Sequence, residues 1–253
     1  MTLAARPGNP KPRLLRLPES RAVINAMGFP GSGLDQAEIR LKAVTASKRR
    51  LLASVSGTIE EEVIECHRRL QLLVSAIELN ISSPNTAGLR VFHEPARLRG
   101  LVEALAAAKT VPLFVKLPPW ERDDRAHSIA LAETAIVGGA DGLIVANSRP
   151  VEDSRLKMGR GGLSGTPLFE QTVRIVAEVS SALPGAALIG CGGVSSASDT
   201  WRLLASGADA VQLYTGLVYE GPTLPSRINR QLVAMMDRLG LKGVAEISGA
   251  PPF

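Results

Sequence analysis

The chain has 253 residues, of which 45% are hydrophobic, and this is enough for one large α/β domain with a substantial core. An aromatic content of only 4% argues against a surface that stacks the bases of single-stranded nucleic acid, so we expect no nucleic-acid partner. The net charge of +5 suits an anionic small ligand or an acidic membrane surface, and the two cysteines have no disulfide or metal-site spacing, which indicates a reducing, cytoplasmic compartment and no metal.

Along the chain, apolar runs typical of short buried strands alternate with amphipathic stretches typical of helices. After an irregular, proline-broken start over residues 1–12, we expect strands at residues 51–55, 76–79, 112–117, 142–146, 186–189 and 210–213. We expect helices at residues 36–44, 59–73, 96–108, 126–137, 168–181, 198–206 and 224–239. Short strands that alternate with helices of this length indicate parallel βα units.

The number of these units fits two α/β architectures. Six units would suffice for an open doubly wound sheet, whereas a closed (β/α)8 barrel needs eight. Glycine-rich or polar turns follow the last two expected strands, at residues 190–194 and 214–216, and such turns form the usual phosphate site of these barrels. We therefore predict a TIM-type (β/α)8 barrel that is incomplete at the N-terminus. A third glycine-rich stretch, residues 159–165, is expected to be a flexible polar loop or a linker.

The densest group of polar residues follows the second expected strand. Residues 80–86 read Asn-Ile-Ser-Ser-Pro-Asn-Thr, directly after the apolar run that ends at Leu79. Two amides at a strand end can bind a flat polar ligand from two sides, and a serine between them can act on it. An ordinary polar turn built around Pro84 remains the alternative.

Several stretches, taken together, resemble dihydroorotate dehydrogenase, and specifically its quinone-linked class. The resemblance extends over nearly all of the chain, and its most specific parts are the Asn80 motif and the Tyr-Thr-Gly segment that begins at Tyr214. The matching stretches are residues 6–14, 22–29, 80–90, 114–117, 141–148, 161–165, 190–194, 211–219 and 221–222.

This resemblance implies an FMN enzyme that oxidises dihydroorotate to orotate in de novo pyrimidine biosynthesis, with a quinone as the final electron acceptor. The residue that matches the catalytic position is Ser83, which would remove a proton from ring carbon 5 while a hydride leaves carbon 6 for FMN. A serine at this position is typical of the quinone-linked class. Since a free hydroxyl is a poor base, its proton would have to be relayed onward.

Other positions match the substrate and cofactor sites of the family. Asn25, Asn80, Asn85 and Asn147 would bind the pyrimidine and its carboxylate. Lys116 would lie beside the flavin and stabilise the charge of its reduced form, although a strand-end lysine can also simply reach solvent. The remaining matches would hold FMN and its phosphate: Ser148, Ser164, Gly165, Gly192, Gly193, Tyr214 and Thr215.

The sequence departs from the family at two places. Before the point where this sequence starts, the family carries N-terminal helices and a first strand that ends in an Ala-Ala-Gly flavin loop with a substrate-binding lysine. We therefore expect residues 1–253 to form one FMN-binding barrel domain without these parts, and we expect the peripheral membrane association of the full-length family. The family's asparagine after the third strand is also missing from the run at residues 51–57, so Ser54 or Ser56 is expected to replace its flavin contact.

Two other functions remain open at this stage. One is a different FMN barrel that acts on another pyrimidine, and the Ser83 motif argues against it. The other is a non-catalytic remnant of a dihydroorotate dehydrogenase, which the absent N-terminal strand would favour. The activity of this short form and its oligomeric state are not determined by the sequence.

Overall fold

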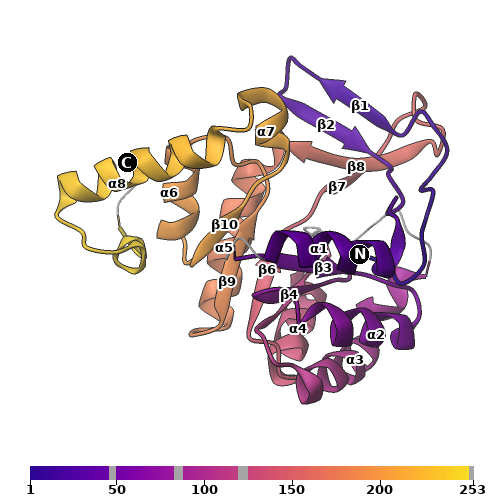
Figure 1. Cartoon of the computed structure of the whole chain (residues 1–253). Helices are drawn as coiled ribbons and strands as arrows, with labels where there is room; N and C mark the ends of the chain where they lie inside the picture. Colours follow the sequence, from indigo (N-terminus) through magenta and orange to yellow (C-terminus); the bar gives the residue numbers. More distant parts are fainter. Residues whose placement is uncertain (46–49, 83–87, 119–124, 251–253) are drawn as a thin grey trace.

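The computed structural model describes residues 1–45, 50–82, 88–118 and 125–250. In this part of the chain the strands form two sheets, one parallel and one antiparallel (Figure 1). The antiparallel sheet lies at the top of the view, and the helices α2, α3 and α4 lie at the opposite end of the molecule.

The parallel sheet has six strands in the order β10-β9-β6-β5-β4-β3. Each strand falls within a few residues of a stretch predicted from the sequence. The sheet curves into part of a barrel, which confirms the predicted incomplete (β/α)8 fold, and its edges among the described residues are β3 and β10. The bounds are β3 (Leu52–Val55), β4 (Ala76–Asn80), β5 (Leu113–Lys116), β6 (Gly142–Val145), β9 (Ala187–Cys191) and β10 (Ala210–Gln212).

The helices cover the outer face of this sheet because one side of each strand is apolar. On β5, for example, Leu113 and Val115 are fully buried in the same core cluster as Leu101 and Leu105 of α3. No helix among the described residues is both long enough and apolar enough to cross a membrane. The helices are α1 (Gly33–Thr45), α2 (Glu60–Leu70), α3 (Pro95–Ala108), α4 (Arg125–Val137), α5 (Phe169–Ala182), α6 (Ala197–Ala205), α7 (Thr215–Glu220) and α8 (Leu224–Leu239).

The antiparallel sheet was not predicted from the sequence. Its strands are β1 (Leu14–Leu17), β2 (Ala22–Asn25), β7 (Arg149–Glu152) and β8 (Arg160–Gly165), in the order β1-β2-β8-β7. The expectation of a flexible loop or linker at residues 159–165 is therefore wrong, because most of this stretch is β8. The glycines allow close packing: a Cβ on Gly161 would lie 2.7 Å from the carbonyl oxygen of Asn25.

We predict that the largest fully buried side chain among the described residues is a stability determinant. Trp201 on α6 is 0% exposed, and its helix packs against α5 and α8. Trp201→Ala should lower the free energy of unfolding by about 3–5 kcal/mol, because it leaves a large cavity. Urea denaturation measures this loss. Ile39→Ala, at a side chain that is 61% exposed, is the control and should change stability by less than about 0.5 kcal/mol.

Candidate functional site

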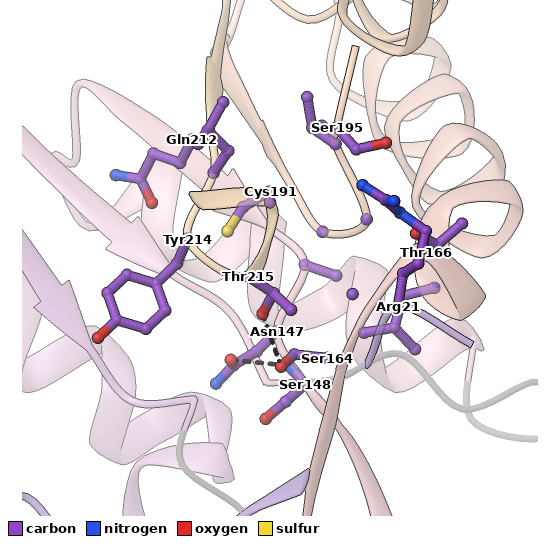
Figure 2. Close-up of a pocket in the computed structure, with 18 of the residues that line it drawn as sticks. Arg21, Asn147, Ser148, Ser164, Thr166, Cys191, Ser195, Gln212, Tyr214 and Thr215 are labelled. Carbon is purple, nitrogen blue, oxygen red and sulfur yellow. Dashed lines mark hydrogen bonds between the residues drawn. The ribbon is translucent and has the colours of Figure 1, made fainter. Parts of the chain in front are cut away.

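A pocket opens where the carboxyl ends of β5, β6, β9 and β10 meet strands β2 and β8 of the antiparallel sheet (Figure 2). This is the end of a parallel barrel at which ligand-binding loops are expected. Many residues predicted from the sequence line it: Asn25, Lys116, Asn147, Ser148, Ser164, Gly165, Gly192, Gly193, Tyr214 and Thr215.

The other predicted site residues lie in or next to the Asn80 motif. Asn80 is the last residue of β4 and pairs with Lys116 in the register of β4 and β5, so the motif begins beside the pocket wall. Ser83 and Asn85 fall outside the described residues, and their assigned roles stay predictions.

Two of the predicted amides are joined by Ser82, a fully buried serine that the sequence analysis did not single out. The Ser82 hydroxyl donates to Asn80 Oδ1 at 2.5 Å and accepts from Asn147 Nδ2 at 2.6 Å. Asn147 Oδ1 in turn accepts the backbone N–H of Ser148 at 2.7 Å. Among the described residues the amide nitrogen of Asn80 has no partner, so its two N–H groups are available to a ligand.

The turn after β9 can be built only with glycine. Gly192 and Gly193 have φ values of 141° and 79°. A Cβ on Gly192 would lie 2.6 Å from Thr172 Oγ1, and one on Gly193 would lie 2.6 Å from the backbone nitrogen of Phe169, at the start of α5. The turn is therefore pressed against α5, and its backbone faces the pocket with no side chain in between. Exposed backbone N–H groups in such turns are typical anion-binding groups.

The opposite wall is tied together by hydroxyl groups. Thr215, the first residue of α7, donates to Ser164 Oγ at 2.9 Å (Figure 2). Ser164 in turn donates to the carbonyl of Val23 at 3.2 Å. Tyr219 Oη also donates to the carbonyl of Ala22, at 2.6 Å. These bonds fasten α7 to β2 and β8, so the antiparallel sheet forms a fixed wall of the pocket.

Lys116 points into the pocket rather than reaching solvent. Its Nζ donates to Gln212 Oε1 at 3.4 Å and to Cys191 Sγ at 3.6 Å. Burial by itself lowers the pKa of this ammonium group, but the nearby Cys191 sulfur and the Glu78 carboxylate outweigh burial and raise the pKa above its ordinary value. The lysine therefore carries its charge at neutral pH.

Two lining residues have no counterpart in the sequence-based prediction. Gln212 at the end of β10 contacts Lys116, and Arg21, just before β2, reaches the pocket while forming an ion pair with Glu220. Arg21 also lies over the ring of Tyr219, 5.6 Å from its centroid. A lone basic residue before a short strand carries no sequence signal for a site, because only the fold brings it to α7 and the pocket.

The two serines expected to replace a missing flavin contact are used elsewhere. Ser54 donates to Glu78 Oε1 at 2.6 Å, and Ser56 donates to the carbonyl of Asn80 at 2.8 Å. Neither serine lines the pocket, so both hydroxyl groups stabilise the sheet behind it.

Comparison with known proteins places these features in a family. A family model described as "Dihydroorotate dehydrogenase" matches residues 1–236. The chain is 38% identical over 271 residues to a dihydroorotate dehydrogenase (quinone) of Allorhizobium ampelinum, and the match covers 97% of this chain and 73% of that protein. A protein of the same name from Halobacterium salinarum is 37% identical over 269 residues, with 99% of this chain and 74% of that protein covered.

A solved structure supports the same comparison. The crystal structure of DHODH from Eimeria tenella in complex with ferulenol superposes with a TM-score of 0.87 at 28% sequence identity. The superposition covers 99% of this chain and 78% of that one.

The glycine turn generates a prediction about the expected flavin phosphate. Gly193→Ala should strongly reduce the FMN retained by the purified protein, because the added methyl group would press on the Phe169 backbone. Flavin absorbance per protein after gel filtration measures this. Gly185→Ala is the matched control, since Gly185 has a similar φ of 88° but a methyl group added there would meet no atom within 4 Å. Normal FMN content in Gly193→Ala would place the phosphate elsewhere.

Proposed function

This chain belongs to the dihydroorotate dehydrogenase family, and we propose that it oxidises dihydroorotate to orotate in pyrimidine biosynthesis, with FMN as cofactor and a quinone as electron acceptor. The observation that carries the proposal is the convergence of three features around one pocket. These are the amide cluster of Asn80, Ser82 and Asn147, the half-buried Lys116 ammonium, and the Gly192–Gly193 turn.

The residues around the pocket fit FMN. The Gly192–Gly193 turn offers backbone N–H groups to a phosphate, and a side chain at either position would clash with α5. Ser148, Ser164, Gly165, Tyr214 and Thr215 add hydroxyl and backbone groups along the same wall. When bound, FMN supplies hydride acceptance. Lys116 places a positive charge where the flavin ring would gain negative charge.

The substrate would be held by amides. Asparagine offers donors and acceptors without adding charge, which suits a planar pyrimidine with carbonyl and N–H groups at its edge. We assign this role to Asn25, Asn80, Asn85 and Asn147. Ser82 supports it, because its hydroxyl fixes which way Asn80 and Asn147 turn.

We assign removal of the proton on carbon 5 to Ser83. Its position three residues after Asn80 keeps it close in sequence to the amide cluster. A serine hydroxyl takes up a proton only if its own proton passes onward, so the role includes a relay.

A peripheral membrane contact completes the proposal. A quinone with an apolar tail partitions into a bilayer, and the net charge of +5 favours an acidic lipid surface.

The activity of the chain is tested directly. The purified protein is supplied with FMN, dihydroorotate and a short-chain quinone, and orotate formation and quinone reduction are followed together. We expect both, in equal amounts. Oxidation of dihydrouracil instead of dihydroorotate would indicate the alternative, a flavin enzyme that acts on another pyrimidine. If the protein binds FMN but dihydroorotate does not reduce it, the proposal is contradicted.

Two adjacent serines should differ in their effects. Ser83→Ala should slow flavin reduction by dihydroorotate by ~10²–10⁴-fold, the usual contribution of a positioned base. Ser82→Ala removes the hydroxyl that orients two amides, so it should raise KM roughly tenfold, equivalent to about 1.4 kcal/mol, with a smaller effect on the reduction rate. Stopped-flow reduction over a range of dihydroorotate concentrations measures both. An unchanged rate in Ser83→Ala would remove Ser83 from the mechanism.

Lys116 should matter through its charge. Lys116→Met keeps most of the side-chain length and removes the ammonium, so the midpoint potential of bound FMN should fall and its reduction should slow. Lys109→Met is the control, because Lys109 pairs with Asp141 at 2.7 Å and does not line the pocket. A potential that is equal in both variants would contradict the role of Lys116.

A further inference from the structure

A carboxylate is buried inside the parallel sheet, next to the pocket but not lining it. Glu78 is the middle residue of β4 and is 4% exposed. Its neighbours Ile77 and Leu79 face the helices, so strand alternation directs Glu78 to the concave side of the sheet. Burying a carboxylate costs free energy unless it is paired and hydrogen-bonded. None of the substrate or cofactor roles proposed above involves Glu78.

The partners of Glu78 lead across the sheet to Lys116. Oε1 of Glu78 accepts from Ser54 Oγ at 2.6 Å, and Oε2 accepts from Gln212 Nε2 at 3.3 Å. The other end of the Gln212 amide, Oε1, accepts from Lys116 Nζ at 3.4 Å. The amide therefore turns its donor toward the anion and its acceptor toward the cation, the orientation in which both ends are satisfied.

The titratable groups in contact with these residues are few in the described part of the chain. Cys191 on β9 contacts Lys116, and the α-amino group of Met1 donates to the carbonyl of Ser54 on β3. Burial lowers the pKa of both amines and Glu78 acts electrostatically against it; at Lys116 the pKa ends above its ordinary value, whereas the pKa of the Met1 amine stays below its own. The buried Glu78 and the half-buried Lys116 thus form a pair of opposite charges separated by one neutral amide.

We propose that Glu78 is a positioning residue that acts through Gln212 to hold the Lys116 ammonium charged and directed into the pocket. The proposal rests on the proposed function only for its consequence, that Glu78 tunes the flavin indirectly. The carboxylate touches neither the pocket nor the reacting atoms. Its effect is transmitted by charge and by the hydrogen-bonded amide, which also sets where the lysine tip lies.

Titration of Lys116 in the full chain without added flavin tests the proposal. The protein is labelled with 13C at the lysine ε-carbons, and the Lys116 signal is identified by its absence from Lys116→Met. Its chemical shift is then followed with pH. In Glu78→Gln the midpoint for loss of the lysine proton should move to lower pH, because burial still opposes the charge and the compensating anion is gone.

Two further variants keep the test decisive. Gln212→Leu removes the amide that links Glu78 to Lys116 but keeps the Ser54–Glu78 bond. It should move the midpoint of the Lys116 titration to lower pH as well. This variant tests the proposal even if Glu78→Gln does not fold. Glu103→Gln, at an exposed carboxylate of α3 paired with Arg99, should leave the midpoint unchanged. An unchanged midpoint in folded Glu78→Gln or Gln212→Leu would overturn the proposal.

The flavin measurement separates this inference from the proposed function. With FMN bound, the midpoint potential is measured as a function of pH. The pH at which loss of the Lys116 proton changes the slope of this curve should be lower in Glu78→Gln. If the chain binds no FMN, the proposed function fails while the lysine titration still decides the role of Glu78. If FMN binds and dihydroorotate reduces it but the titration does not move, the role of Glu78 alone is refuted.

Discussion

Side chains alternate between the two faces of a strand, and this constraint lets one sheet provide both the core and the site. On β5, Leu113 and Val115 face the helices, while Phe114 and Lys116 face the concave side. Apolar burial on the first face stabilises the sheet, and the second face can carry polar groups such as Lys116. A shift of β5 by one residue would place Lys116 among the helices and remove its charge from the pocket, so the register of the core also fixes the chemistry.

The parallel part of the fold was predictable because its signals are local. Each strand is a short apolar run bounded by turn residues, and each helix has its own amphipathic pattern. The antiparallel sheet lacked such signals. Its strands are four to six residues long, β7 contains Pro150, and β8 contains three glycines, which is a composition typical of loops. What makes them strands is pairing between residues 22–25 and 162–165, far apart in the sequence, and no local pattern encodes that pairing.

The candidate site was predictable where a motif carries a constraint of its own. The Gly192–Gly193 turn excludes other residues, and its spacing after an apolar run is visible in the sequence. Ser82, Gln212 and Glu78 were not identified, because their importance lies in partners on other strands. Glu78 in particular interrupts an apolar strand, an anomaly visible in the sequence, but its meaning depends on Gln212, which lies 134 residues further along the chain.

The bonds within the antiparallel sheet, and those that fasten α7 to it, affect when the pocket can exist during synthesis. Asn25 reaches the carbonyl of Gly162, 137 residues later, and the hydroxyl of Tyr219 reaches the carbonyl of Ala22 across 197 residues. The βα units of the parallel sheet depend mostly on contacts between units that are close in sequence, so they can pack as they leave the ribosome. The binding wall has to wait until residue 219 has emerged, whereas the last strand of the parallel sheet ends at residue 212, so a nascent chain could pair that sheet before it had a place for a ligand.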